Sequence, residues 1–249
     1  MFFLCLMSNA TTIIIPQPKG AVMSNRPDVT GRRSFLGTLA AGATALGLSG
    51  LALQSEAHAT TVAPPAPSDA SFDAWLKKIK GKHRQVFDAP EVHEGMALVW
   101  SRVFLMTNKQ VGVADNDVSA VIILRHSAIP IAMNDSLWTK YKFGEMFKVQ
   151  DAATKAPSTR NFFRLWEEFM LPECGVEAVQ KSGVLLGVCD MALTVYSSMA
   201  AKEMNMDPTE CKKDWVAGLL PGIQIVPSGV LAVNRAQERG CTYCFAGGE

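Results

Sequence analysis

Short apolar runs alternate with apolar stripes at helical spacing from residue 83 almost to the end of the chain. The run 118–124 is nearly continuous and rich in β-branched residues, which is typical of a buried parallel strand. Similar runs predict strands at 83–87, 184–188 and 223–226. Stripes and capping signals predict helices at 72–82, 91–108, 136–146, 160–181 with a break near Pro172, 190–205, 207–219 and 230–239. Strands that alternate with helices in one domain predict an α/β sandwich with a mainly parallel sheet.

Polar or reactive residues end three of these apolar runs. They are Arg125, His126 and Ser127 after the first, Cys189 after the second, and Pro227, Ser228 and Gly229 after the third. In open α/β sheets, ligands bind beyond the carboxyl ends of the strands, so these residues are candidates for a site. His126 suits acid–base chemistry or ligand binding, or a purely structural hydrogen bond. Ser228 is better placed to cap the last helix than to act as a nucleophile, because no Gly-x-Ser-x-Gly elbow is present. We expect His126, Ser228 and Gly229 to support the site or bind a ligand.

Cys189 is the strongest candidate for chemistry. It lies between the apolar run 184–188 and a helix predicted to begin at Asp190. The positive end of a helix favours a thiolate and therefore nucleophilic character. The carboxylate of Asp190 opposes this effect unless that residue caps the helix. The alternative is a buried cysteine that acts only as a small hydrophobic side chain.

Cys241 and Cys244 form a CxxC pair near the end of the chain. Such a pair serves as a disulfide, as a redox or sulfur-handling couple with Cys189, or as half of a metal site. No second CxxC is present, so a metal site would need distant ligands, and we assign neither a metal nor a cofactor. Methionines at helical spacing favour core filling or oligomer contacts over copper binding: Met191, Met199, Met204 and Met206.

The first 59 residues have the layout of an export signal. Arg32 and Arg33 precede an eighteen-residue apolar stretch, 36–53, and a small-x-small sequence closes at Ala59. The twin arginines, followed by Ser-Phe-Leu, resemble a twin-arginine translocation (Tat) signal, which implies the Tat translocase as partner and a periplasmic protein cleaved after Ala59. An uncleaved anchor is the alternative, disfavoured by four glycines in the apolar stretch. Residues 1–22 fit the signal poorly and form a doubtful N-terminal extension.

The remaining chain is predicted to hold a Pro/Ala/Ser-rich linker at 60–71 and a single domain at 72–249, ending in a cysteine-containing tail. The formal net charge of the whole chain is +1 and no basic stripe stands out, which excludes the electrostatic footprint of a nucleic-acid-binding protein. Neither phosphate-binding glycine loop is present, so nucleotide use is not expected. Five cysteines follow the signal, an odd number that leaves at least one thiol unpaired within the chain: Cys174, Cys189, Cys211, Cys241 and Cys244.

Two segments carry a family resemblance. Gly-Val-Leu-Leu-Gly-Val-Cys at 183–189, and Gly-Leu-Leu-Pro-Gly-Ile-Gln-Ile-Val-Pro-Ser-Gly-Val at 218–230, are similar to the DsrE/DsrF-like (YchN-like) family. The resemblance covers 182–237 well and 83–148 loosely, while 148–172 resembles an insertion. It implies a three-layer α/β fold, a homo-oligomer (trimer or hexamer), and sulfur relay as a persulfide on the residue that matches Cys189.

The leading hypothesis is therefore an exported sulfur-relay or thiol-redox protein that acts through Cys189, with Cys241 and Cys244 assisting. One alternative is a non-enzymatic small-ligand-binding or assembly protein of the same fold. Another is a periplasmic metal-binding protein.

Overall fold

Five parallel strands form the centre of the structure, a computed structural model that describes residues 69–166, 171 and 173–248. The predicted signal at 1–59 and most of the predicted linker lie outside the described residues. The last three linker residues, 69–71, belong to the first described helix. None of the helices in the described ranges is long and apolar enough to cross a membrane.

The strand order in the sheet is β4–β3–β2–β1–β5, and every neighbouring pair is parallel. The strands are β1 (His83–Ala89), β2 (Val118–Leu124), β3 (Leu185–Cys189), β4 (Gln224–Val226) and β5 (Thr242–Phe245). Ala89 pairs with Leu124, Leu124 with Val188, and Cys189 with Val226. The carboxyl ends of four strands therefore meet at one edge.

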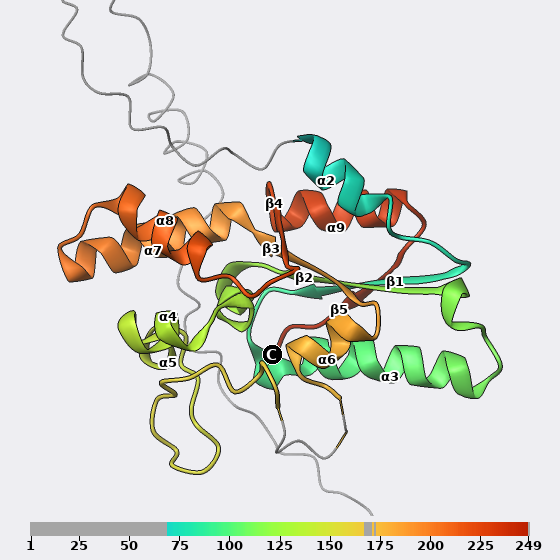
Figure 1. Ribbon diagram of the computed structural model, residues 1–249, viewed down its shortest axis with the longest axis horizontal. Coiled ribbons are helices and arrows are strands. Elements are labelled where there is room, and N and C mark those ends of the chain that lie inside the picture. The colour runs from blue at the N-terminus through green and yellow to red at the C-terminus, as the bar shows by residue number, and fades with distance from the viewer. Residues whose placement is uncertain (1–68, 167–170, 172, 249) are drawn as a thin grey trace, which may run out of the picture. The chain divides into compact units, whose positions relative to one another are not determined.

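Helices cover both faces of this sheet (Figure 1). One face carries α2 (Asp69–Leu76) and α9 (Gly229–Glu238); the other carries α3 (Met96–Gln110) and α6 (Val176–Lys181). Side chains of β2 alternate between the two cores: Val121 packs with Trp75 and Val233, whereas Ile122 packs with Leu98. The predicted three-layer α/β sandwich with a parallel sheet is confirmed.

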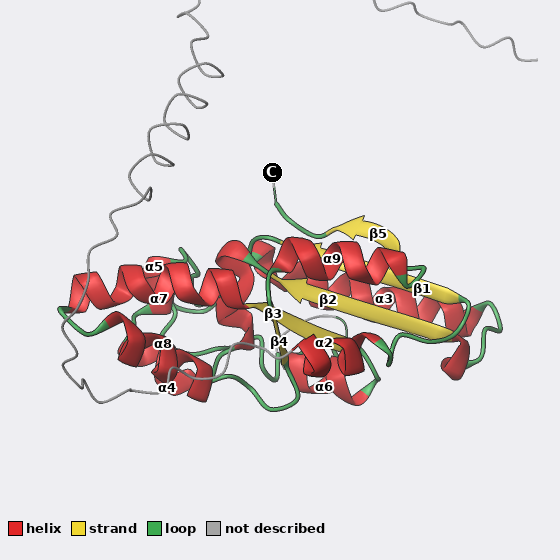
Figure 2. Ribbon diagram, turned by 90° about the horizontal axis from the view of Figure 1, so that it is seen from above, coloured by secondary structure: helices red, strands yellow, loops and turns green. Residues whose placement is uncertain are grey.

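Four helices form a lobe beyond the carboxyl edge of the sheet in both Figure 1 and Figure 2. They are α4 (Asp135–Lys140), α5 (Phe143–Met146), α7 (Asp190–Met204) and α8 (Pro208–Ala217). The lobe has an aromatic centre in which Phe143 and Trp215 meet edge to face, with ring centroids 4.8 Å apart. The Tyr141 hydroxyl donates to Asp214 of α8 at 2.7 Å. The lobe borders the edge that holds the candidate residues.

Local sequence signals set the boundaries of several elements. Asp207 caps α8, its Oδ1 accepting from two backbone N–H groups at 2.9 and 3.0 Å, and Pro208 occupies the first turn. Asn205, with a left-handed backbone at φ 52°, ends α7. Lys142, at φ 50°, divides the helix expected at 136–146 into α4 and α5. Short 3₁₀ turns complete the order: η1 (His93–Gly95), η2 (Asp115–Asp117) and η3 (His126–Ala132).

Among the described residues of the helix expected at 160–181, only Val176–Lys181 are helical, as α6. Residues 161–166 form turns instead, held by the Asn161 amide, which donates to the carbonyls of Ile131 and Met133 at 2.9 and 2.7 Å. Phe162 and Phe163 are consecutive rather than spaced by three or four, so they do not form the stripe of an amphipathic helix. The insertion instead packs against the start of α3.

The cysteine-containing tail includes a strand for which the sequence analysis made no prediction. This is β5, an edge strand whose Tyr243 and Cys244 pair with Val86 and Phe87 of β1. The short run Thr-Tyr-Cys-Phe carries β-forming residues, but it lacks the apolar continuity of the inner strands because an edge strand remains partly exposed.

Candidate functional site

The structure brings together the three strand ends at which the sequence analysis found polar or reactive residues. β2, β3 and β4 are neighbours in the sheet, so Arg125, Cys189 and Ser228 all follow adjacent strand ends at the carboxyl edge. In the pairing of β2 with β3, Leu124 lies opposite Val188. Arg125 and Cys189 are the next residues of their chains and therefore lie side by side.

Cys189 ends β3 and is the N-cap of α7. Its Sγ accepts a hydrogen bond from the backbone N–H of Ala192 at 3.3 Å. The residue is 6% exposed and belongs to the core on the α3 side of the sheet. The sulfur thus combines the burial expected of a hydrophobic cysteine with a position at the positive end of a fifteen-residue helix.

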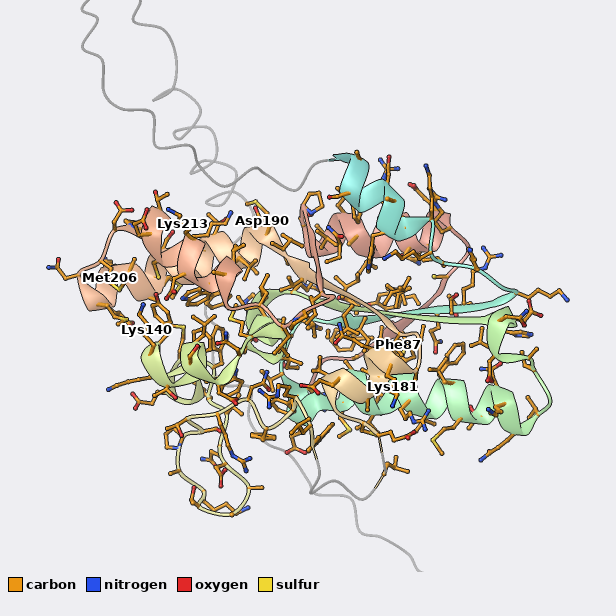
Figure 3. All side chains as sticks on the ribbon, in the orientation of Figure 1. Phe87, Lys140, Lys181, Asp190, Met206 and Lys213 are labelled. Atoms are coloured by element: carbon orange, nitrogen blue, oxygen red, sulfur yellow. The ribbon has the colours of Figure 1, made fainter. Side chains whose placement is uncertain are left out.

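The carboxylate of Asp190 does not stand alone beside this thiol. Lys212 of α8 reaches its two oxygens at 2.9 and 3.0 Å, with both side chains largely buried. Asp190, labelled in Figure 3, stands where α7 begins. Lys212 therefore offsets the negative charge of the residue that follows Cys189.

A partly buried ion pair holds Arg125 at the same edge. Its Nε and Nη2 donate to the two oxygens of Asp88 at 2.6 and 2.9 Å, and the Tyr243 hydroxyl donates to the same carboxylate at 2.9 Å. The hydrogen bond to Asp88 raises the pKa of Arg125, with smaller contributions from other groups that include Cys189. Gly229 gives this side chain room, since a Cβ there would lie 2.5 Å from the Arg125 Cβ. The guanidinium is thus paired with Asp88 of β1, while the backbone of Arg125 lies next to that of Cys189.

Asp88, Tyr243 and Lys212 were not identified from the sequence. Asp88 had a recognisable signal, because it directly follows the apolar residues Val86 and Phe87 of a predicted strand. It is 4% exposed, and a carboxylate buried to this extent needs partners. Tyr243 and Lys212 had none, since each meets its partner through tertiary packing.

His126 is held at the surface by α7. It has a positive φ of 48°, and its Nε2 lies 3.2 Å from the Tyr196 hydroxyl while Nδ1 lies 3.3 Å from the Ser127 hydroxyl. The two rings meet edge to face at 5.7 Å. These contacts agree with a purely structural role for His126, in which its side chain connects the end of β2 to α7.

Ser228 caps α9, as the sequence predicts. Its hydroxyl accepts from the backbone N–H of Leu231 at 3.2 Å. The oxygen is therefore used by the helix, and the role supported for Ser228 is to set the position of Gly229 against Arg125.

Cys241 and Cys244 do not form a pair in the structure, and all five described cysteines are free thiols. Cys241 packs on the α9 side of the sheet, whereas Cys244 packs on the α3 side. Burial raises the pKa of Cys241 to about 11 and also raises that of Cys244. Because the two cysteines pack on opposite faces of the sheet, the geometry does not support a disulfide between them. Three strand spacings, about 14 Å, separate β5 from β3, so it does not support a couple with Cys189 either.

No metal centre is apparent in the described part of the chain. Within those residues, no group of three or more His, Cys, Asp or Glu side chains is arranged to hold an ion. Cys174 and Cys211 are fully buried, and burial raises the pKa of each thiol. The third hypothesis, a metal-binding protein, gains no support from these residues.

A cavity of about 610 Å³ lies near the carboxyl end of β1. Its walls are the segment that follows β1 and the insertion at 147–166, with Ser127 contributing from the end of β2. Cys189 does not line it. This cavity was not predicted from the sequence, because neither wall carries a recognisable motif.

Comparison with known proteins identifies no family. No protein-family model matches the chain, and no curated protein matches it significantly. Among solved structures, it is similar to a protein of unknown function, MTH1491 from Methanobacterium thermoautotrophicum, with 16% identity, a TM-score of 0.36, and coverage of 66% of this chain and 99% of that one. At this TM-score the likeness supports no argument about function.

Proposed function

We propose that the protein is an exported sulfur-relay or thiol-redox protein that acts through Cys189. The observation that carries the proposal is the position of the Cys189 sulfur. It caps a long helix at the carboxyl edge of the sheet, where it accepts a hydrogen bond from the Ala192 N–H, and the strand end that carries Arg125 is its neighbour. The resemblance to the DsrE/DsrF-like family supports the same residue.

The site suits a sulfur that carries negative charge. The backbone amides at the start of α7 suit an anionic sulfur species at Cys189, such as a terminal persulfide. In the relay, the Cys189 thiolate attacks the outer sulfur of a donor persulfide; the donor's S–S bond breaks, and the donor leaves as a thiolate. An acceptor thiolate then takes the same sulfur and releases Cys189, so no external oxidant is needed. Because Cys189 is 6% exposed, the donor must be small or slender.

The export part of the proposal rests on the twin arginines and the small-x-small sequence ending at Ala59. Together they support Tat export, cleavage after Ala59 and a periplasmic mature protein.

The test exposes the mature protein to inorganic polysulfide and maps the added sulfur by mass spectrometry. We expect one added sulfur on Cys189 in the native protein and none in Cys189→Ser. Cys244→Ser is the matched control, because Cys244 is also partly accessible, and it should be modified as the wild type is. Modification that requires unfolding, or that favours the other cysteines, would contradict a role for Cys189.

The cavity near β1 favours the second candidate function, a non-enzymatic protein that binds a small ligand. Its volume of about 610 Å³ falls within the range of small-molecule sites. If binding is the whole function, Cys189→Ser retains the cellular phenotype, whereas changes in the cavity walls remove it.

A further inference from the structure

The cavity near the carboxyl end of β1 has two walls of opposite charge. One wall follows β1 and contributes Glu91 and Glu94; the other belongs to the insertion and contributes Lys148 and Lys155. None of these four side chains forms an ion pair with another described residue. Their charges are therefore available to a ligand in the cavity.

Asp151, the remaining acidic residue of the lining, is already engaged. Its Oδ1 accepts from the backbone N–H groups of Ala153 and Thr154, both at 3.0 Å, and its Oδ2 lies 3.8 Å from Arg160. These contacts lower the pKa of Asp151, led by the bond from the Thr154 backbone. On the insertion wall, Lys148 and Lys155 are therefore the charged residues of the lining that form no ion pair with another described residue.

Aromatic rings of the insertion line the same cavity. Phe163 is 1% exposed and meets Trp166 edge to face at 5.6 Å, while Phe162 lies 4.1 Å from Phe163, and Phe147 completes the set. Gly95 permits this arrangement, because a Cβ there would lie 2.8 Å from both Phe163 and Trp166. A planar apolar group is the complement of such a surface.

Several residues with positive φ, and one buried polar atom without a hydrogen-bond partner in the described structure, also belong to the lining of this cavity. Nine non-glycine residues in the described ranges have positive φ, and five of them line it: His93, Glu94, Lys148, Lys155 and Trp166. Each such conformation has a cost, and strained residues concentrate at binding sites. Nδ1 of His93 is buried without a hydrogen-bond partner in the described structure, although most buried polar atoms have one.

We propose that this cavity binds a small aromatic zwitterion, with its ammonium toward Glu91 and Glu94, its carboxylate toward Lys148 and Lys155, and its ring on the partly exposed rings of Phe162 and Trp166. Free aromatic amino acids have this chemistry. The site does not involve Cys189, so the proposal is independent of the sulfur-relay function.

Calorimetric titration of the mature protein with four probes tests the charge and ring requirements. The probes are L-phenylalanine, 3-phenylpropionate (no ammonium), phenethylamine (no carboxylate) and L-alanine (no ring). We expect L-phenylalanine to bind at least about tenfold more tightly than the other three, since each lacks one charge-assisted or aromatic contact. Equal binding of the first three probes, or no advantage over L-alanine, overturns the proposal.

Variants locate the two charges. The double change Lys148→Gln and Lys155→Gln should weaken L-phenylalanine and 3-phenylpropionate about tenfold or more, and leave phenethylamine unchanged. Lys181→Gln, at an exposed lysine of α6 outside the cavity, is the matched control and should bind as the wild type does. If the double variant behaves like this control, the lysine wall does not hold the carboxylate and the proposal is wrong.

Discussion

At the scale of single residues, the environment of Cys189 depends on pairs that its neighbours form. Lys212 neutralises Asp190, and Asp88 fixes Arg125. Both pairs link segments that are distant in the sequence. A cysteine at the start of a helix is a pattern that the sequence reveals, whereas the charges around it depend on side chains that only the folded sheet and lobe bring near.

Cys241 provides a residue-scale prediction for the dependence of stability on pH. An ordinary cysteine pKa lies near 9, and burial raises that of Cys241 to about 11. Between these values the unfolded chain loses the proton while the folded protein retains it, so stability present below pH 9 is lost as the pH rises. We expect the wild type to lose about 1–2 kcal/mol more between pH 9 and 11 than Cys241→Ala does.

Urea denaturation at the two pH values measures this difference. Other buried thiols and tyrosines titrate in both proteins, so their contributions cancel in the comparison. Identical losses in wild type and variant would show that Cys241 is not held protonated by the fold.

At the scale of elements, Ser228 connects helix capping to the site. Ser228→Ala removes the acceptor for the Leu231 N–H, and we expect it to lower the free energy of unfolding by about 1 kcal/mol. Ser228→Asp restores an acceptor at the N-cap and should recover most of the loss. The measurement is urea denaturation of both variants. Ser198→Ala, at an exposed serine of α7, controls for loss of a hydroxyl and should have a smaller effect.

This pair of variants also separates capping from chemistry. If Ser228 reacted, Ser228→Asp would lose activity while keeping its stability. Retained activity in Ser228→Asp supports the capping role.

Elements were predictable wherever periodicity and caps agreed. The apolar run 118–124 coincides with β2, and the start signal at Asp207 and Pro208 coincides with that of α8. Prediction failed at 160–181 and at β5, where tertiary contacts decide the conformation. The amide of Asn161 fixes the first segment, and pairing with β1 fixes the second. The same limit applies to the site: the strand ends were recognised, but the partners of Arg125 and the charged cavity were not.

At the scale of the whole molecule, α7 carries both the candidate thiol and an apolar surface stripe. Met191, Val195 and Met199 recur every four residues and are 57%, 51% and 52% exposed. The methionines were expected to fill the core or form oligomer contacts, and these two lie on the surface. The family resemblance implies a homo-oligomer, and a stripe of this kind fits an interface between copies.

We therefore expect the mature protein to self-associate through this stripe. Met191→Lys combined with Met199→Lys places two like charges in the contact and should yield monomers at concentrations where the wild type is oligomeric, as measured by sedimentation velocity. Val111→Lys, at a residue that is 78% exposed beyond α3, is the matched control and should leave the assembly intact. Because Cys189 caps α7, an interface along its stripe would hold the helix whose first turn contacts the thiol. The double variant should then remain folded but accept sulfur more slowly from polysulfide, and an oligomer unchanged by the two lysines would move the interface to another surface.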